Sequence, residues 1–170
     1  GKEALAAVGG SVNQIVNLIV EVFVGLTSGA SVIVSQFYGA RDKKNLERTI
    51  HTVYALAVAA GIVIGILGLL LSGTILECMN TPGELMKDSL TYLHIYFIGI
   101  VFNLVYNMGA SALRAMGDSR RPLYVLAVAC SLNIVLDLLL VVVFQMGVAG
   151  AATATIFCQG ISACIVTWML

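Results

Sequence analysis

The sequence predicts a membrane protein built from a bundle of α-helical spans, and three observations lead to this fold class. First, 59% of the residues are hydrophobic and only 11% are charged, whereas a soluble domain carries about 25% charged residues. Second, four long stretches contain no charged residue, at 22–40, 49–76, 89–113 and 138–170. Third, the basic residues gather in the segments between these stretches, as they do in the loops of membrane proteins.

Turn residues divide the chain into five predicted helices, each long enough to cross a bilayer, which requires about 20 apolar residues. The predicted ranges are 9–39, 49–76, 82–113, 122–144 and 147–170. The short alternating strands of a membrane β-barrel do not fit uncharged stretches of this length. Thr81, Pro82 and Glu84 form a predicted capping box at the start of the third helix, and Pro122 is suited to open the fourth.

The distribution of Lys and Arg predicts the orientation in the membrane. Two connecting segments, between the first and second and between the third and fourth helices, hold seven basic residues: Arg41, Lys43, Lys44, Arg48, Arg114, Arg120 and Arg121. The opposite side holds two, Lys2 and Lys87. Because the side richer in Lys and Arg is normally cytoplasmic, we expect Gly1 outside and Leu170 inside a plasma membrane.

Several classes of function find no support in the sequence. The formal net charge is zero and no basic tract is present, so we expect no nucleic-acid partner. We find no Cys–His spacing typical of a metal site, no nucleophile–base pair and no phosphate-binding loop, and therefore expect neither an enzyme nor a bound cofactor. Because the chain begins at Gly1 rather than Met, we expect it to be a piece of a longer protein.

Asp137 is the most informative single residue, because it stands inside the fourth predicted span. A carboxylate at the centre of a membrane helix costs about 2.5–3.5 kcal/mol on the insertion scale, and such residues commonly mark ion pathways. Asn133 lies four residues earlier, on the same helical face. The pair predicts a proton or Na⁺ site; the alternative is a structural hydrogen bond between helices.

Polar stripes on two other helices predict surfaces that face the interior of the bundle. On the third helix the stripe repeats every three or four residues: Tyr92, Tyr96, Gly99, Asn103, Tyr106, Asn107 and Ala110. A similar line on the first helix comprises Asn17, Glu21, Ser28, Ser31 and Ser35. Of these residues, Tyr92, Asn103, Tyr106, Asn107 and Glu21 are candidates for lining a substrate cavity. The alternatives are hydrogen bonds between helices and, for Glu21, a structural pair.

Glycines spaced four residues apart predict close approaches between helices. The pairs are Gly25 with Gly29 in the first helix and Gly61 with Gly65 in the second.

Three segments together resemble the MATE (multidrug and toxic compound extrusion) family of transporters. The segment ending in Ser35-Gln-Phe-Tyr-Gly-Ala-Arg-Asp42 resembles the end of that family's second helix. The segment 112–122, followed by Asn133 and Asp137, resembles its junction of the fourth and fifth helices. The segment 147–155 resembles the opening of its sixth helix.

The resemblance implies that residues 1–170 are helices two to six of the amino-terminal half of a twelve-helix, two-lobe transporter. The first helix and the carboxy-terminal lobe would then be the missing partners, and 1–9 an outer loop. It implies a cation-coupling site at Asp137, Asn133 and Thr155, with Thr153 as an alternative to Thr155, and fourth-helix polar positions at Tyr92 and Asn107. Either H⁺ or Na⁺ would be the coupling ion.

The expected function is therefore export of organic cations in exchange for H⁺ or Na⁺ by alternating access, which this piece alone would not perform. One alternative is a related flippase of lipid-linked oligosaccharides, which predicts Arg and Lys inside the cavity, where these spans have none. A second alternative is a structural membrane subunit that transports nothing.

Overall fold

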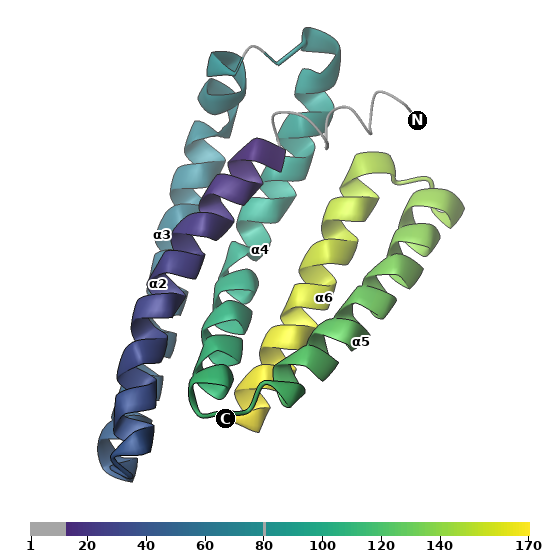
Figure 1. Cartoon of the computed structure of the whole chain (residues 1–170). Coiled ribbons are helices and arrows are strands. Elements are labelled where there is room, and N and C mark those ends of the chain that lie inside the picture. The colour runs from purple at the N-terminus through teal and green to yellow at the C-terminus, as the bar shows by residue number, and fades with distance from the viewer. Residues whose placement is uncertain (1–12, 80) are drawn as a thin grey trace.

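Five membrane-length helices account for nearly all of the chain in the computed structural model, which describes residues 13–79 and 81–170. The helices are α2 (Asn13–Gly39), α3 (Lys43–Cys78), α4 (Gly83–Ala115), α5 (Arg120–Asp137) and α6 (Gly147–Met169), and α5 continues as a π-helix, η2 (Leu138–Val143). Figure 1 shows them as one elongated bundle. The predicted all-helical membrane fold is confirmed.

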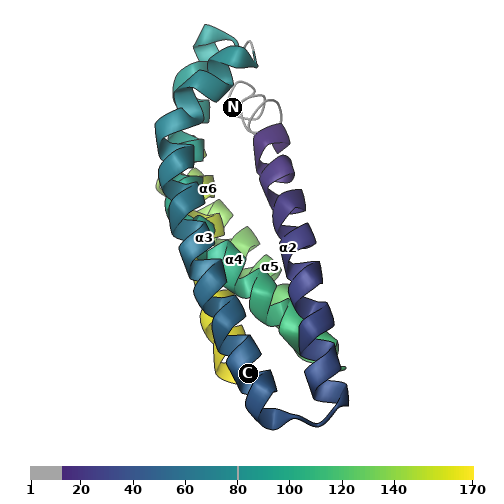
Figure 2. The ribbon, with the colours of Figure 1, turned by 90° about the vertical axis from the view of Figure 1, so that its left-hand side faces the viewer.

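Helix α4 is the centre of the bundle, since it packs against α2, α3 and α6, while α5 packs mainly against α6. Figures 1 and 2 show α2 and α3 on one side of α4, with α5 and α6 on the other. The largest buried cluster is centred on α4 and includes Leu93, Phe97, Ile100, Leu104 and Met108. Because α4 has neighbours on three sides, its polar stripe also faces other helices.

Helices α3 and α4 approach each other closely at two glycines. A Cβ atom added to Gly61 would lie 2.9 Å from the Cα of Val101, and one added to Gly65 would lie 2.9 Å from the carbonyl oxygen of Phe97. The prediction of close packing is correct for this pair. It is wrong for Gly25 and Gly29, where an added Cβ meets nothing within 4 Å among the described residues.

This difference predicts unequal costs for the same substitution. Gly65→Ala should destabilise the full-length protein by about 1–3 kcal/mol, because backbone has to move to admit the methyl group. Gly29→Ala meets no obstruction from the described helices, and Ala favours helix, so it should cost less than Gly65→Ala. Thermal unfolding of both variants in detergent provides the measurement. Equal stability of the two variants would contradict the close packing of α3 on α4.

The helix α3 begins at Lys43, six residues earlier than the predicted 49. Its N-cap is Asp42, whose Oδ1 accepts a hydrogen bond from the Asn45 backbone N (3.2 Å) and whose Oδ2 accepts one from Asn45 Nδ2 (2.6 Å). The charged residues from Lys43 to Arg48 therefore form the first turns of a helix rather than a loop. A capping carboxylate stabilises the free N–H groups of the first turn, so local capping outweighs the composition of this segment.

Two other helix starts differ from the predictions. Pro82, not Thr81, occupies the N-cap of α4, which begins at Gly83. Helix α5 begins at Arg120, two residues before Pro122, with the Asp118 Oδ1 accepting from the backbone N of Arg120 (3.2 Å) and of Arg121 (3.1 Å). Pro122 remains acceptable within the first turn, since N–H groups there have no partner inside the helix. The predicted residues 9–12 of the first helix lie outside the described residues.

The end of the fourth predicted helix is wider than an α-helix. From Leu138 to Val143 the backbone is a π-helix, and the N–H of Phe144 donates to the carbonyl of Leu139 (3.0 Å). The helix α6 follows after a short turn with positive φ at Gln145 (53°) and Gly147 (57°). The two helices are antiparallel neighbours, as the shortness of the turn predicts.

Candidate functional site

A polar cavity of about 320 Å³ lies between α4, α5 and α6, with Val20 of α2 at its edge. Three residues of α4 line it, namely Asn103, Tyr106 and Asn107. The helices α5 and α6 contribute the rest of the polar lining: Cys130, Asn133, Thr155, Cys158, Gln159 and Ser162. Leu126 and Ala129 complete the wall. Thus five of the residues predicted for the cavity and the cation site share one cavity: Asn103, Tyr106, Asn107, Asn133 and Thr155.

The spacing on α4 explains how its polar residues reach the cavity. Residues 103, 106 and 107 lie one turn apart on one face of the helix. The side chain of Asn107 is held there by its own helix, because its Nδ2 donates to the carbonyl oxygen (2.8 Å) and to Oδ1 (2.9 Å) of Asn103. These hydrogen bonds fix the direction of the two amides and leave Tyr106 beside them as an aromatic surface.

Three buried polar atoms around the cavity have no hydrogen-bond partner among the described residues. They are Asn133 Nδ2, Gln159 Oε1 and Asp137 Oδ1. An unpaired buried polar atom costs about 1–3 kcal/mol, and each such atom in a native structure requires an explanation. A side-chain amide offers an oxygen or an NH₂ group according to its rotation, and a carboxylate oxygen binds a cation. The atoms are therefore suited to bind a ligand that the protein itself does not supply.

Asp137 is the last residue of α5 and lies one turn beyond Asn133. It is not part of the cavity lining, but it is within electrostatic range of Tyr92 and Cys158. It also lies closer to the η2 end of its span than the predicted mid-span position, because α5 begins at Arg120 and η2 ends at Val143. The π-helix begins directly after it, and π-helical turns occur frequently at functional sites.

Tyr92 is not among the residues that line the cavity, although it is within electrostatic range of Asp137. Its ring stacks on that of Tyr96, with centroids 6.4 Å apart and an angle of 11° between the planes. Of the predicted stripe on α4, Asn103, Tyr106 and Asn107 line the cavity, whereas Tyr92 and Tyr96 do not.

The structure distinguishes between the two threonines of α6. Thr155 lines the cavity, and its Oγ1 donates to the carbonyl of Ala151 (3.0 Å), which leaves the lone pairs of the hydroxyl free to accept or to bind a cation. Thr153 is exposed and is not among the lining residues. Thr155 is thus the threonine placed to take part in the site.

Glu21 is a third predicted site residue, after Asp137 and Tyr92, that is not among the residues lining the cavity. It lies on the exposed face of α2, next to Val20, which does line the cavity. The neighbouring polar residues Asn17 and Ser28 of the same line are exposed as well.

Gln159 lines the cavity but was not among the site residues predicted from the sequence. The signal was present, because Thr155, Gln159 and Ser162 follow one another at intervals of four and three residues on one face of α6. The same periodicity that identified the stripe on α4 would have found these residues.

Comparison with known proteins decides the family. The MatE family model matches residues 1–139. The chain belongs to the MatE family. A curated relative, the probable multidrug resistance protein YpnP of Bacillus subtilis, is 40% identical over 162 residues, which cover 95% of this chain and 36% of the relative.

Solved MATE structures have the same arrangement of helices. A structure described as the inward-facing conformation of a multidrug resistance MATE family transporter of the MOP superfamily matches with a TM-score of 0.94 and 28% identity, over 100% of this chain and 38% of that one. The corresponding outward-facing structure matches with a TM-score of 0.92 and 28% identity, over 99% of this chain and 37% of that one. The chain thus spans little more than a third of the length of its relatives.

Membership of this family and the five membrane-length helices make the chain part of a multi-pass membrane protein. The twelve-helix proteins to which it is similar extend well beyond it.

Proposed function

We propose that the full-length protein exports organic cations in exchange for H⁺ or Na⁺. The observation that carries this proposal is a group of buried polar atoms that have no hydrogen-bond partner among the described residues, on Asn133 and Gln159 in the cavity lining and on Asp137 one helical turn beyond Asn133. Names of relatives such as YpnP support drug export as the process.

In this proposal the coupling ion binds at Asp137 and Asn133, with Thr155 as a further oxygen donor. Asp137 supplies the charge, and Asn133 lies one helical turn away, close enough to share one ion. The organic cation would occupy the cavity beside Asn103, Tyr106 and Asn107, where an aromatic face attracts a positive charge and the amides accept hydrogen bonds. Because the two sites are adjacent, occupation of one can change the affinity of the other.

Alternating access is the proposed route across the membrane, with this bundle moving as one body. The similarity of the chain to an inward-facing structure (TM-score 0.94) is nearly equal to its similarity to an outward-facing one (0.92). A bundle that retains its arrangement in both states supports a rocking motion between two rigid lobes.

Glu21 would serve as a substrate contact from α2 in the complete protein. A carboxylate exposed to lipid within a span is costly, so the exposed face of α2 that carries it is expected to meet the central cavity or the rest of the transporter.

The test is transport by the purified full-length protein in liposomes. A proton gradient or a sodium gradient, imposed separately, should drive accumulation of a fluorescent organic cation, and the gradient that succeeds identifies the coupling ion. A membrane potential of 100 mV adds about 2.3 kcal/mol per charge moved, so the potential is clamped in both cases. Absence of transport with either gradient, in liposomes that bind the dye, would contradict the proposal.

Two other functions make different predictions in the same experiment. A flippase would translocate a labelled lipid-linked oligosaccharide rather than the organic cation, and Arg or Lys would be expected beside its pyrophosphate. The described lining of the polar cavity contains neither residue. A structural subunit would transport nothing and would tolerate neutral replacement of Asp137.

We also propose that the end of the bundle formed by the α2–α3 and α4–α5 turns is cytoplasmic in a plasma membrane. It carries the seven basic residues, and three exposed aromatic residues of the kind found at membrane interfaces lie near it, Tyr38, Tyr124 and Trp168.

Single cysteines in a background without other thiols test this orientation. Lys44→Cys should react with an impermeant reagent only from the cytoplasm, and the natural Cys78, which is exposed at the opposite end, only from outside. The reverse labelling would overturn the orientation.

A further inference from the structure

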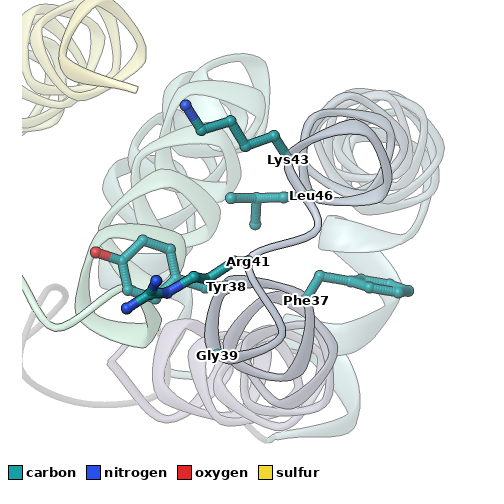
Figure 3. A pocket seen from close by; sticks show the side chains of 6 residues that line it. All are labelled: Phe37, Tyr38, Gly39, Arg41, Lys43 and Leu46. Carbon is teal, nitrogen blue, oxygen red and sulfur yellow. The ribbon is translucent and has the colours of Figure 1, made fainter.

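The turn between α2 and α3 contains a second hollow, separate from the polar cavity. Its volume is about 520 Å³, and it is lined by Phe37, Tyr38, Gly39, Arg41, Lys43 and Leu46. Figure 3 shows the side chains of Arg41 and Lys43 extending toward the same side of the turn, with Leu46 between them and Tyr38 beside Arg41. The hollow therefore combines two cationic groups with an aromatic ring and an apolar wall.

The two cations have no acidic partner at this turn. No salt bridge among the described residues involves Arg41 or Lys43. Asp42, which lies between them in sequence, has both carboxylate oxygens engaged with Asn45, at 3.2 and 2.6 Å. By contrast, Arg121 at the same end of the bundle is paired with Asp118 at 3.0 Å. The positive charge at the hollow is thus available to an anion from outside the chain.

The backbone of the turn places the two cationic residues together. Arg41 has a positive φ of 55°, so the chain reverses sharply and brings residues 41 and 43 to one side of the hollow.

We propose that this hollow binds the phosphate headgroup of an anionic phospholipid. The phosphate would lie between Arg41 and Lys43, and the acyl chains would follow the apolar surface of the helices. The location favours a lipid over a soluble anion, because the apolar spans α2 and α3 meet here and Tyr38 is 50% exposed, as an interfacial aromatic residue is. Basic pockets between membrane helices at the cytoplasmic surface are suited to such headgroups.

The test measures binding of a fluorescent phosphatidylglycerol to the purified full-length protein in detergent. Each basic residue near a charged lipid contributes about 1 kcal/mol, so Arg41→Asn and Lys43→Gln should each weaken binding about fivefold, and together about thirtyfold. Asn is chosen at 41 because it tolerates a positive φ. The matched control is Lys44→Gln, which removes the same charge one residue away from a side chain that does not line the hollow. It should weaken binding less than Arg41→Asn or Lys43→Gln does, because its side chain does not line the hollow.

Two further measurements decide between the possible ligands. Phosphatidylcholine with the same acyl chains should bind more weakly than phosphatidylglycerol, because its headgroup has no net charge. Excess inorganic phosphate should not displace the lipid; displacement of the lipid by phosphate alone would show that the site takes a soluble anion, and would overturn the proposal. Binding unchanged in the double variant, or weakened equally by Lys44→Gln, would also overturn it. Thermal unfolding without lipid establishes that each variant is folded. Transport activity does not enter this test, so its failure would not bear on the proposed export.

Discussion

Replacing Asp137 by Asn in the full-length transporter is expected to reduce gradient-driven export to the level of empty liposomes. Asn keeps the shape of the side chain but has neither the negative charge nor a proton that titrates, so neither H⁺ nor Na⁺ coupling can proceed through it. The protein should still insert and fold, because Asp137 Oδ1 has no hydrogen-bond partner among the described residues and removal of a charge favours insertion. Dye efflux under an imposed gradient is the measurement.

Asp88→Asn is the matched control for this variant. It makes the same chemical change near the start of α4, away from the residues that line the polar cavity, and should leave export unchanged. Export at the wild-type rate by a well-folded Asp137→Asn protein would show that Asp137 is structural. The coupling site would then have to be sought elsewhere, and Glu21 is the next acidic residue within a span.

Replacing Gln159 by Leu should affect stability and transport in opposite directions. The buried Gln159 Oε1 has no partner among the described residues, so an apolar side chain of similar size should stabilise the protein by about 1–3 kcal/mol. A hydrogen bond to the transported compound would be lost at the same time. We expect a rise of up to about tenfold in the substrate concentration that gives half-maximal export.

Thr153→Val provides the comparison for Gln159→Leu, because Thr153 is on the same helix but exposed and outside the cavity. It should alter neither thermal unfolding nor export. A Gln159→Leu protein that is less stable than the wild type and transports normally would show that Gln159 has a structural partner, and would remove it from the proposed substrate site.

Much of the fold follows from local chemistry and could be predicted from the sequence. Each span must satisfy its own backbone hydrogen bonds in lipid, so a long uncharged apolar stretch implies a helix whatever its neighbours are. The polar stripe on α4 could also be predicted, since residues three and four positions apart share a face of any α-helix. The same local rule could have identified Thr155, Gln159 and Ser162 on α6.

Helix ends were less predictable, because they depend on single hydrogen bonds. The helix α3 begins six residues before the predicted position since Asp42 caps it, although the composition of 43–48 is that of a loop. The π-helix after Asp137 also has no signal in the apolar sequence 138–143. Its wider turn is compatible with hydrophobic residues of any order, so pattern alone does not distinguish it from an α-helix.

By itself the sequence determined five membrane helices, the helical faces that carry polar residues and the isolated carboxylate of Asp137, because all of these depend on hydrophobicity and helical periodicity within one segment. The tertiary structure alone decided which faces meet. It placed Gly61 and Gly65 against α4, whereas Gly25 and Gly29 have no described residue close to the position of an added Cβ, although the two pairs have the same spacing. It likewise gathered the side chains of α4, α5 and α6 around one cavity and left Glu21 outside. Contacts between helices depend on the shapes of both surfaces, which no single segment of sequence contains.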